Sequence, residues 1–102
     1  MKVAYIAGAY RGDGMPDTIY ENITIARSYA KKYWQMGYAV FCPHMNTAFM
    51  DGACEDEIWL SGALEIMRRC DVLILLPGWE KSSGSVAELK EAERLDMEIV
   101  YA

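Results

Sequence analysis

A glycine-rich segment near the start of the chain surrounds an arginine. Gly8, Gly12 and Gly14 flank Arg11 within a few positions. Glycine lets the backbone turn sharply and approach a ligand closely, and the forked guanidinium suits an anion. The segment has neither the G-x-G-x-x-G spacing of a dinucleotide-binding loop nor the G-K-[ST] ending of a P-loop. Gly8, Arg11 and Gly12 are therefore candidate ligand-binding residues, and an ordinary glycine-rich turn is the alternative.

A second candidate for anion binding is the serine-rich run at 82–85, where a helix is expected to begin. Free backbone N–H groups and the positive end of the helix dipole favour phosphate at such a place, and hydroxyl groups add donors. The simpler alternative is that these serines only cap the helix. Glu88 is ambiguous in the same way, because Ser85-x-x-Glu88 matches a capping box. From spacing alone the capping interpretation is favoured.

The single histidine and the three cysteines predict no metal site. His44 has no partner ligands nearby in the sequence, and we expect it on the surface or capping a helix. Cys42, Cys54 and Cys70 include no C-x-x-C pair, so reduced core thiols of a cytoplasmic protein are expected. These residues predict neither a metal nor a cofactor.

Aromatic side chains could stack against a ligand base. In a small domain they more often lie in the core or at a subunit interface, and this is the expectation for Trp59 and Tyr10. Trp79 follows a strand and lies in a loop at the expected ligand edge. We therefore take Trp79 as the candidate stacking residue.

These residues have to be positioned by alternating strands and helices. The pattern of apolar runs and helical periodicity predicts the order βαβαβαβ in one domain over residues 1–102. Strands joined through helices run parallel, which predicts an α/β fold: an open parallel sheet of about four strands with helices on both faces, flavodoxin-like or Rossmann-like. The strands are expected at 3–7, 38–42, 71–76 and 97–101, and the helices at 16–36, 55–69 and 84–95.

The same topology predicts where a ligand binds. Ligands of open parallel sheets lie beyond the carboxyl ends of the strands, where the strand order reverses. The loops 8–15, 44–52 and 77–83 fall at that edge, and they carry most of the unusual residues.

Composition narrows the class of partner. Hydrophobic residues make up 53% of the chain, and the formal net charge is −5. A nucleic-acid polymer is not expected as a partner because its affinity comes from a basic face. The N-terminus is too short for a signal peptide, and no apolar run is long enough to span a membrane, so a soluble cytoplasmic protein is expected. A small domain leaves much of its surface uncovered, and we expect a homodimer.

Three motifs in order resemble the nucleoside 2-deoxyribosyltransferase-like superfamily. They are YIAGxxRG at 5–12, CDV at 70–72 and SxGxxxEL at 82–89. The likeness is closer to the short branch, which holds the 2′-deoxynucleoside 5′-phosphate N-hydrolases and small bacterial and phage proteins of unknown function. The segment LLPGWEKS at 75–82 resembles the latter group. The resemblance covers nearly the whole chain.

The resemblance implies a reaction at the N-glycosidic bond of a deoxynucleoside or its 5′-monophosphate, without a cofactor. Glu88 matches the nucleophile that attacks the anomeric carbon, and Tyr5 matches the residue that steers that carboxylate. Arg11, Ser82 and Gly84 match residues that hold the 5′-phosphate. Water or a second base then resolves the covalent intermediate, as in a retaining glycosidase. The base, and the choice between hydrolysis and transfer, stay open.

Two positions depart from the family pattern. The family has an aspartate that assists departure of the base, and this chain has Ala63 there. The hydrolases have a serine in the first loop where this chain has Ala9. General acid help is typically worth about 100-fold to 10,000-fold in rate. A nucleotide-binding or sensing module without catalysis is therefore the alternative function.

Overall fold

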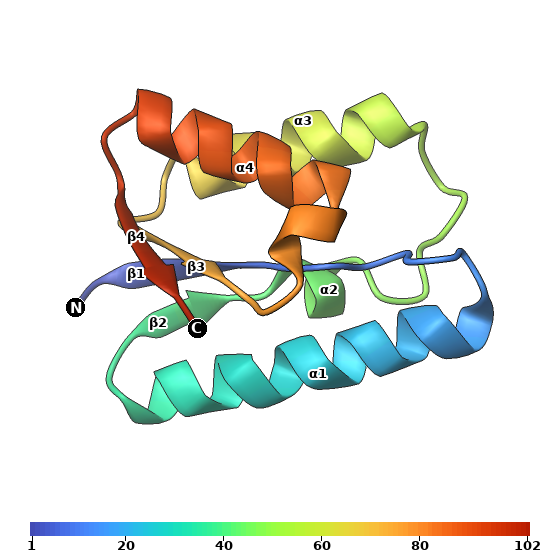
Figure 1. Cartoon of the computed structure of the whole chain (residues 1–102), viewed down its shortest axis with the longest axis horizontal. Coiled ribbons are helices and arrows are strands. Elements are labelled where there is room, and N and C mark those ends of the chain that lie inside the picture. Colours follow the sequence, from blue (N-terminus) through green and yellow to red (C-terminus); the bar gives the residue numbers. More distant parts are fainter.

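The computed structural model describes residues 1–102, and its chain alternates between strands and helices as the sequence predicts (Figure 1). The long elements begin and end within about two residues of the predicted positions. Two short elements were not predicted, because a helical turn that begins at Pro43 and a 3₁₀ turn at 79–81 lie in segments that were expected to be loops. The elements are β1 (Val3–Ala7), α1 (Pro16–Gln35), β2 (Ala39–Phe41), α2 (Pro43–Asn46), α3 (Asp56–Met67), β3 (Val72–Leu75), a 3₁₀ turn η1 (Trp79–Lys81), α4 (Ser83–Arg94) and β4 (Glu98–Tyr101).

The four strands form one parallel sheet in the order β2-β1-β3-β4. Tyr5 of β1 lies between Phe41 of β2 and Leu73 of β3. The chain runs from β1 outward to β2 at one edge of the sheet, and it then returns past β1 to β3 and continues to β4 at the other edge. The order therefore reverses beside β1, and the loops after β1 and β3 lie at the edge where open sheets bind ligands.

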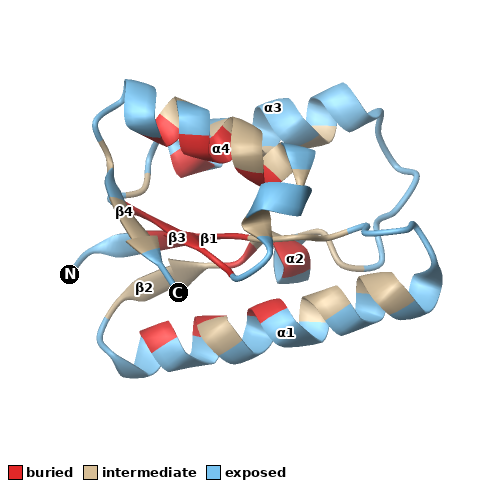
Figure 2. Cartoon of the chain, in the orientation of Figure 1, coloured by how far each residue is buried: buried red, intermediate tan, exposed pale blue.

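Both faces of the sheet are covered, as predicted, because β1 and β3 are apolar on both sides. Ala4 and Ile6 pack toward α1, while Tyr5 and Ala7 pack toward α3 and α4. Figure 1 shows α1 on one side of the sheet and α3 with α4 on the other. Buried residues follow the two central strands and the inner sides of these helices (Figure 2). Alternate residues of a strand point to opposite faces, so a continuous apolar run serves both layers.

The helix starts differ from the sequence interpretation. Thr18-x-x-Glu21, like Ser85-x-x-Glu88, has the spacing of a capping box, but neither box forms: α1 begins at Pro16 without a side-chain cap, and α4 takes Ser82 as its N-cap. Proline at the first helical position has no N–H that needs a cap, and its fixed φ suits the helix. The shifted start of α4 places Glu88 beyond the first turn, where a carboxylate no longer faces free N–H groups.

Two further expectations about the core were wrong. The apolar spacing in the helix expected at 55–69 predicts Leu60 on its buried stripe, but Leu60 is 39% exposed, and Cys54 is exposed instead of being a core thiol. The core contacts of α3 come from its second half, where Ala63 and Leu64 are partly buried and Met67 is fully buried. None of the helices combines the length and the apolar composition that a membrane-spanning helix needs.

Candidate active site

The centre of the site is a buried pair formed by Tyr5 and Glu88. Tyr5 lies in the central strand β1 with no exposed surface, and Glu88 of α4 is 7% exposed. The Tyr5 hydroxyl donates a hydrogen bond to Oε2 of Glu88, although the two residues are 83 positions apart in the sequence. The capping interpretation of Glu88 was therefore wrong. Its carboxyl group bonds to a residue of the central strand and not to the backbone of the helix start.

Burial sets the protonation of this pair. It raises the pKa of Glu88 from 4.5 to about 7, and the hydrogen bond from Tyr5 opposes this rise. Burial and the nearby carboxylate raise the pKa of Tyr5 well above its usual value. The phenol therefore keeps its proton and acts as a donor, while the carboxyl group changes charge near neutral pH. A titrating carboxyl group in a cavity wall is a common feature of catalytic sites.

A cavity of about 760 Å³ opens above the pair, within the usual size of a small-molecule site. Its walls come from the loop after β1, the segment around α2, one side of α3 and the start of α4. These segments follow different strands, and the parallel topology brings them to one edge. Of the residues selected from the sequence, the structure brings together Tyr5, Gly8, Arg11, Gly12, Ser82, Gly84 and Glu88 around this cavity.

Packing and backbone conformation explain why two of these positions are occupied by glycine. A Cβ at Gly8 would lie 2.9 Å from Cδ1 of Leu76. Gly12 has a φ of +55°, and a Cβ there would lie 2.7 Å from Thr18 Cγ2. Both positions therefore favour glycine whether or not a ligand binds, because larger residues would clash or strain the backbone.

Trp79 lies away from the cavity. Its ring is 6.1 Å from the ring of Tyr101, and it packs against the core on the side of α3 and α4. Trp59 and Tyr10 line the cavity instead, although we expected them in the core or at an interface. The signal that could have found Trp59 is its position in the first turn of α3, because that end of the helix approaches the same sheet edge.

At the mouth of the cavity Arg11 is paired with a carboxylate. Its Nη1 and Nη2 donate to Oδ2 and Oδ1 of Asp56 at 3.0 and 2.7 Å. The bonds from Arg11 lower the pKa of Asp56, so this carboxylate is ionised. The guanidinium group of Arg11 thus binds two acceptor oxygens side by side, and a phosphate group can present two oxygens in the same arrangement.

His44 is buried under the first loop, so the predicted surface or capping role was wrong. Its side chain is 4% exposed, and Nε2 lies 3.0 Å from the carbonyl oxygen of Ala9 and 3.2 Å from that of Gly8. Carbonyl oxygens only accept, so Nε2 carries a proton and donates. Burial lowers the pKa of His44, which keeps the ring neutral. His44 therefore ties the glycine-rich loop to α2.

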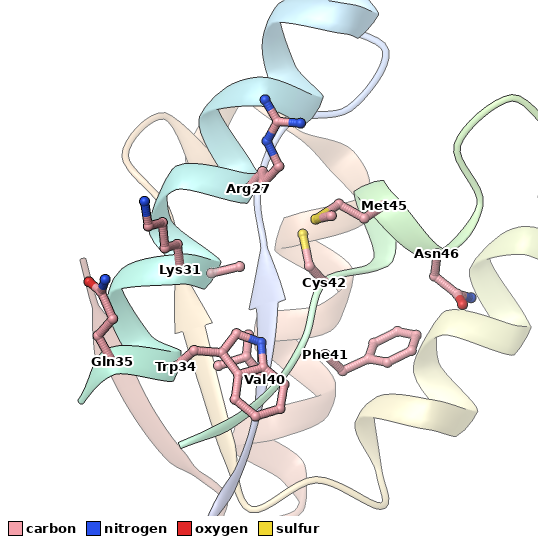
Figure 3. A pocket seen from close by; sticks show the side chains of 10 residues that line it. Arg27, Lys31, Trp34, Gln35, Val40, Phe41, Cys42, Met45 and Asn46 are labelled. Carbon is pink, nitrogen blue, oxygen red and sulfur yellow. The ribbon is translucent and has the colours of Figure 1, made fainter. Parts of the chain in front are cut away.

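A second hollow of about 530 Å³ lies between α1 and the edge strand β2 (Figure 3). Trp34 and Val40 form its floor at one end, and Arg27 stands at the other (Figure 3). It contains no carboxylate, and its one thiol, Cys42, has a pKa raised by burial. This hollow offers no ionised nucleophile or general base. The cavity above Glu88 is therefore the candidate active site.

Comparisons with known proteins agree with this fold. The structure is similar to a 2-desoxiribosyltransferase from Leishmania mexicana, with a TM-score of 0.63 and 21% sequence identity. The match covers 99% of this chain and 63% of that chain, so this chain spans less than two thirds of the enzyme's length. No curated protein matches the sequence. The model of the family described as domain of unknown function DUF7768 matches residues 2–102, and the chain belongs to that family.

Proposed function

We propose that this chain acts on the N-glycosidic bond of a small 2′-deoxynucleoside or its 5′-monophosphate, with Glu88 as the nucleophile. The observation that carries the proposal is the buried Tyr5–Glu88 pair in the wall of a cavity of nucleotide size. The reaction is N-glycosidase chemistry if water completes it and deoxyribosyl transfer if a second base does. The fold shared with a 2-desoxiribosyltransferase is consistent with either outcome.

In the first step a carboxylate oxygen of Glu88 attacks the anomeric carbon. The bond from this carbon to the base nitrogen breaks, and its electron pair leaves with the base. The product is an ester between the sugar and Glu88, which is the covalent intermediate of a retaining mechanism. Water or another base then attacks the same carbon, and the carboxylate is released.

Tyr5 positions the nucleophile. Its hydroxyl donates to Oε2 of Glu88, which leaves Oε1 free to face the cavity. The raised pKa of Tyr5 keeps this donor protonated throughout the pH range in which the carboxyl group titrates. A single fixed hydrogen bond limits rotation of the carboxylate, so the attacking oxygen stays aligned.

A 5′-phosphate would be bound at the start of α4 and by Arg11. Ser82 caps the helix by accepting from the backbone N–H of Ser85 at 3.2 Å, and the N–H of Gly84 stays available to a ligand. Helix N-termini favour anions for this reason. A phosphate that binds the guanidinium group of Arg11 has to displace Asp56, because the Asp56 carboxylate accepts hydrogen bonds from both Nη1 and Nη2.

Departure of the base is the weak point of the proposed reaction. Ala63 lines the cavity but has no acidic group, and the other lining carboxylates, Asp51 and Asp56, are exposed and bonded to Tyr10 and Arg11. This observation favours a second candidate function, in which the cavity binds or senses a nucleotide without turnover. The two functions share the ligand and differ in whether base is released.

The test is incubation of the chain with each 2′-deoxynucleoside and each 5′-monophosphate, followed by chromatography for free base. We expect release from at least one of them and none from Glu88→Ala. Glu91→Gln is a matched control because Glu91 lies one turn further along α4 and does not line the cavity. Release that survives Glu88→Ala would place the chemistry elsewhere. Binding without release in any sample supports the sensing function.

A further inference from the structure

Ser85 is the one residue with a buried side-chain oxygen that has no hydrogen-bond partner. It lies in the first turn of α4, is 1% exposed and lines the cavity. Its backbone N–H donates to Ser82 Oγ, but its own Oγ bonds nothing in the chain. The neighbouring cavity residue on the same helix face is Glu88, one turn further along.

Three hydroxyl groups in or directly after other helices of this chain do find partners. Thr24, Ser28 and Thr47 each donate back to a carbonyl oxygen of the preceding turn, at 3.0, 2.6 and 3.2 Å. Ser85 does not use this common arrangement. An unpaired buried hydroxyl costs stability, and alanine would fill nearly the same space without that cost. The hydroxyl of Ser85 therefore has a role other than helix stability.

We infer that Ser85 determines specificity by forming a hydrogen bond with the 3′-hydroxyl of the sugar. The inference rests on the proposed function, because it takes a deoxynucleotide as the ligand. A serine hydroxyl offers one donor and two acceptor positions, so a group that both donates and accepts satisfies it best. In a 2′-deoxynucleoside 5′-monophosphate the 3′-hydroxyl is the one hydroxyl group on the sugar. The phosphate and the ring oxygen chiefly accept.

The position of Ser85 fits this contact. The phosphate site proposed at Ser82 and Gly84 is at the helix start, and Glu88 reaches the anomeric carbon from the next turn. Ser85 lies between them, as the sugar lies between its phosphate and its base. A nucleotide without the 3′-hydroxyl would leave Ser85 unpaired inside a closed complex, and sites built in this way reject such analogues.

The experiment compares a 2′-deoxynucleoside 5′-monophosphate with its 2′,3′-dideoxy analogue by calorimetry. The binding assays use a Glu88→Gln background, so that the ligand is not consumed. With Ser85 present we expect the dideoxy nucleotide to bind about tenfold more weakly. In the added variant Ser85→Ala we expect this difference to disappear, because the deoxynucleotide loses affinity and the analogue does not.

Thermal unfolding of single variants separates a ligand contact from a structural role. We expect Ser85→Ala to be as stable as the parent or more stable, because no internal hydrogen bond is lost. Ser82→Ala is the contrast, since it removes the cap and should lower the melting temperature. The role of Ser85 is overturned if Ser85→Ala loses as much stability as Ser82→Ala. It is also overturned if the Ser85→Ala protein still binds the deoxynucleotide more tightly than the dideoxy analogue. Equal affinity for both nucleotides in the parent also overturns it, and binding of neither overturns the proposed function itself.

Discussion

Replacing Glu88 with glutamine should stabilise the protein, and the gain should depend on pH. Glutamine has nearly the same shape as glutamate, and its amide oxygen can still accept the bond from the Tyr5 hydroxyl. The substitution removes a carboxyl group that is 7% exposed and must ionise inside the protein. Catalytic groups commonly cost stability in this way, because the function needs a charge that burial opposes.

The size of the effect follows from the pKa of Glu88, which burial raises from 4.5 to about 7. Each tenfold change in an acid constant is worth 1.36 kcal/mol, so the ionised group costs about 3 kcal/mol of folding free energy. Below pH 4.5 the carboxyl group is neutral in both the folded and the unfolded chain, and this cost is absent. It grows as the pH rises from 4.5 to 7, because only the unfolded chain then releases the proton, and it is constant above 7.

The assay is urea unfolding of the native chain and of Glu88→Gln at several pH values between 4 and 8.5. We expect the difference in unfolding free energy to rise by about 3 kcal/mol across this range, equivalent to a melting temperature higher by on the order of 10 °C at pH 8. A part of the difference in unfolding free energy that is the same at every pH reports the replacement of the carboxylic acid by the amide, and not the ionisation of Glu88. The other carboxyl groups contribute equally to the unfolding free energies of the two proteins, so they do not change the difference between them.

Glu91→Gln, a substitution on the same helix, is a control for which we expect a change in stability of the opposite sign. Bonds from Arg94 and Arg68 lower the pKa of Glu91 to about 2, so its contribution to stability is present above pH 4.5 and is lost as the pH falls toward 2. Glu91→Gln should therefore lower stability at neutral pH. If the curves of the native chain and Glu88→Gln run parallel, or if Glu88→Gln is the less stable protein at pH 8, the assignment of a buried, raised-pKa carboxyl group to Glu88 is refuted.

Four further predictions concern activity and assembly. Base release should rise with pH around an apparent pKa near 7, because the proposed nucleophile Glu88 must be ionised, and a rate profile that is flat from pH 5 to 9 would contradict this. Asp56→Asn should bind 5′-monophosphates about fivefold more tightly in calorimetry without a matching change for nucleosides, because it frees Arg11, and an unchanged phosphate preference would argue against that anion site. Ala63→Asp, checked for folding by circular dichroism, should release base faster than the parent in the chromatographic assay, and a folded variant that binds nucleotide but releases none would favour the sensing function. Sedimentation at micromolar concentration should find a homodimer, because α3 exposes Ile58 by 59% among other apolar side chains, and monomer alone would count against this.

The elements and their order could be predicted because they depend on local patterns. The run at 3–7 is apolar at successive positions, as a strand covered on both faces requires, and the turn at Gly37 has the positive φ that favours glycine. Parallel pairing then follows from the helical connections between strands. The short helix α2 was missed because its four residues have no periodicity to detect.

Some of the residues that line the cavity could also be predicted, because the parallel topology fixes where the loops lie. Loops that follow parallel strands meet at one edge, so Arg11 and Ser82 line one cavity although they are far apart in the sequence. Which side chains point inward is a separate question. Trp79 follows β3 as expected but turns toward Tyr101, while Trp59 faces the cavity from α3.

The sequence by itself determined the α/β order, the edge at which the loops gather and the residue types available there. Only the tertiary structure shows which groups Glu88 and His44 contact. Local spacing made Glu88 a helix cap and gave His44 a surface role, because a pattern in one segment contains nothing about distant partners. Folding brings the hydroxyl of Tyr5 to Glu88 and the carbonyl oxygens of Gly8 and Ala9 to His44. Both side chains are buried, and burial lowers the pKa of His44 and raises that of Glu88, on which the proposed chemistry depends.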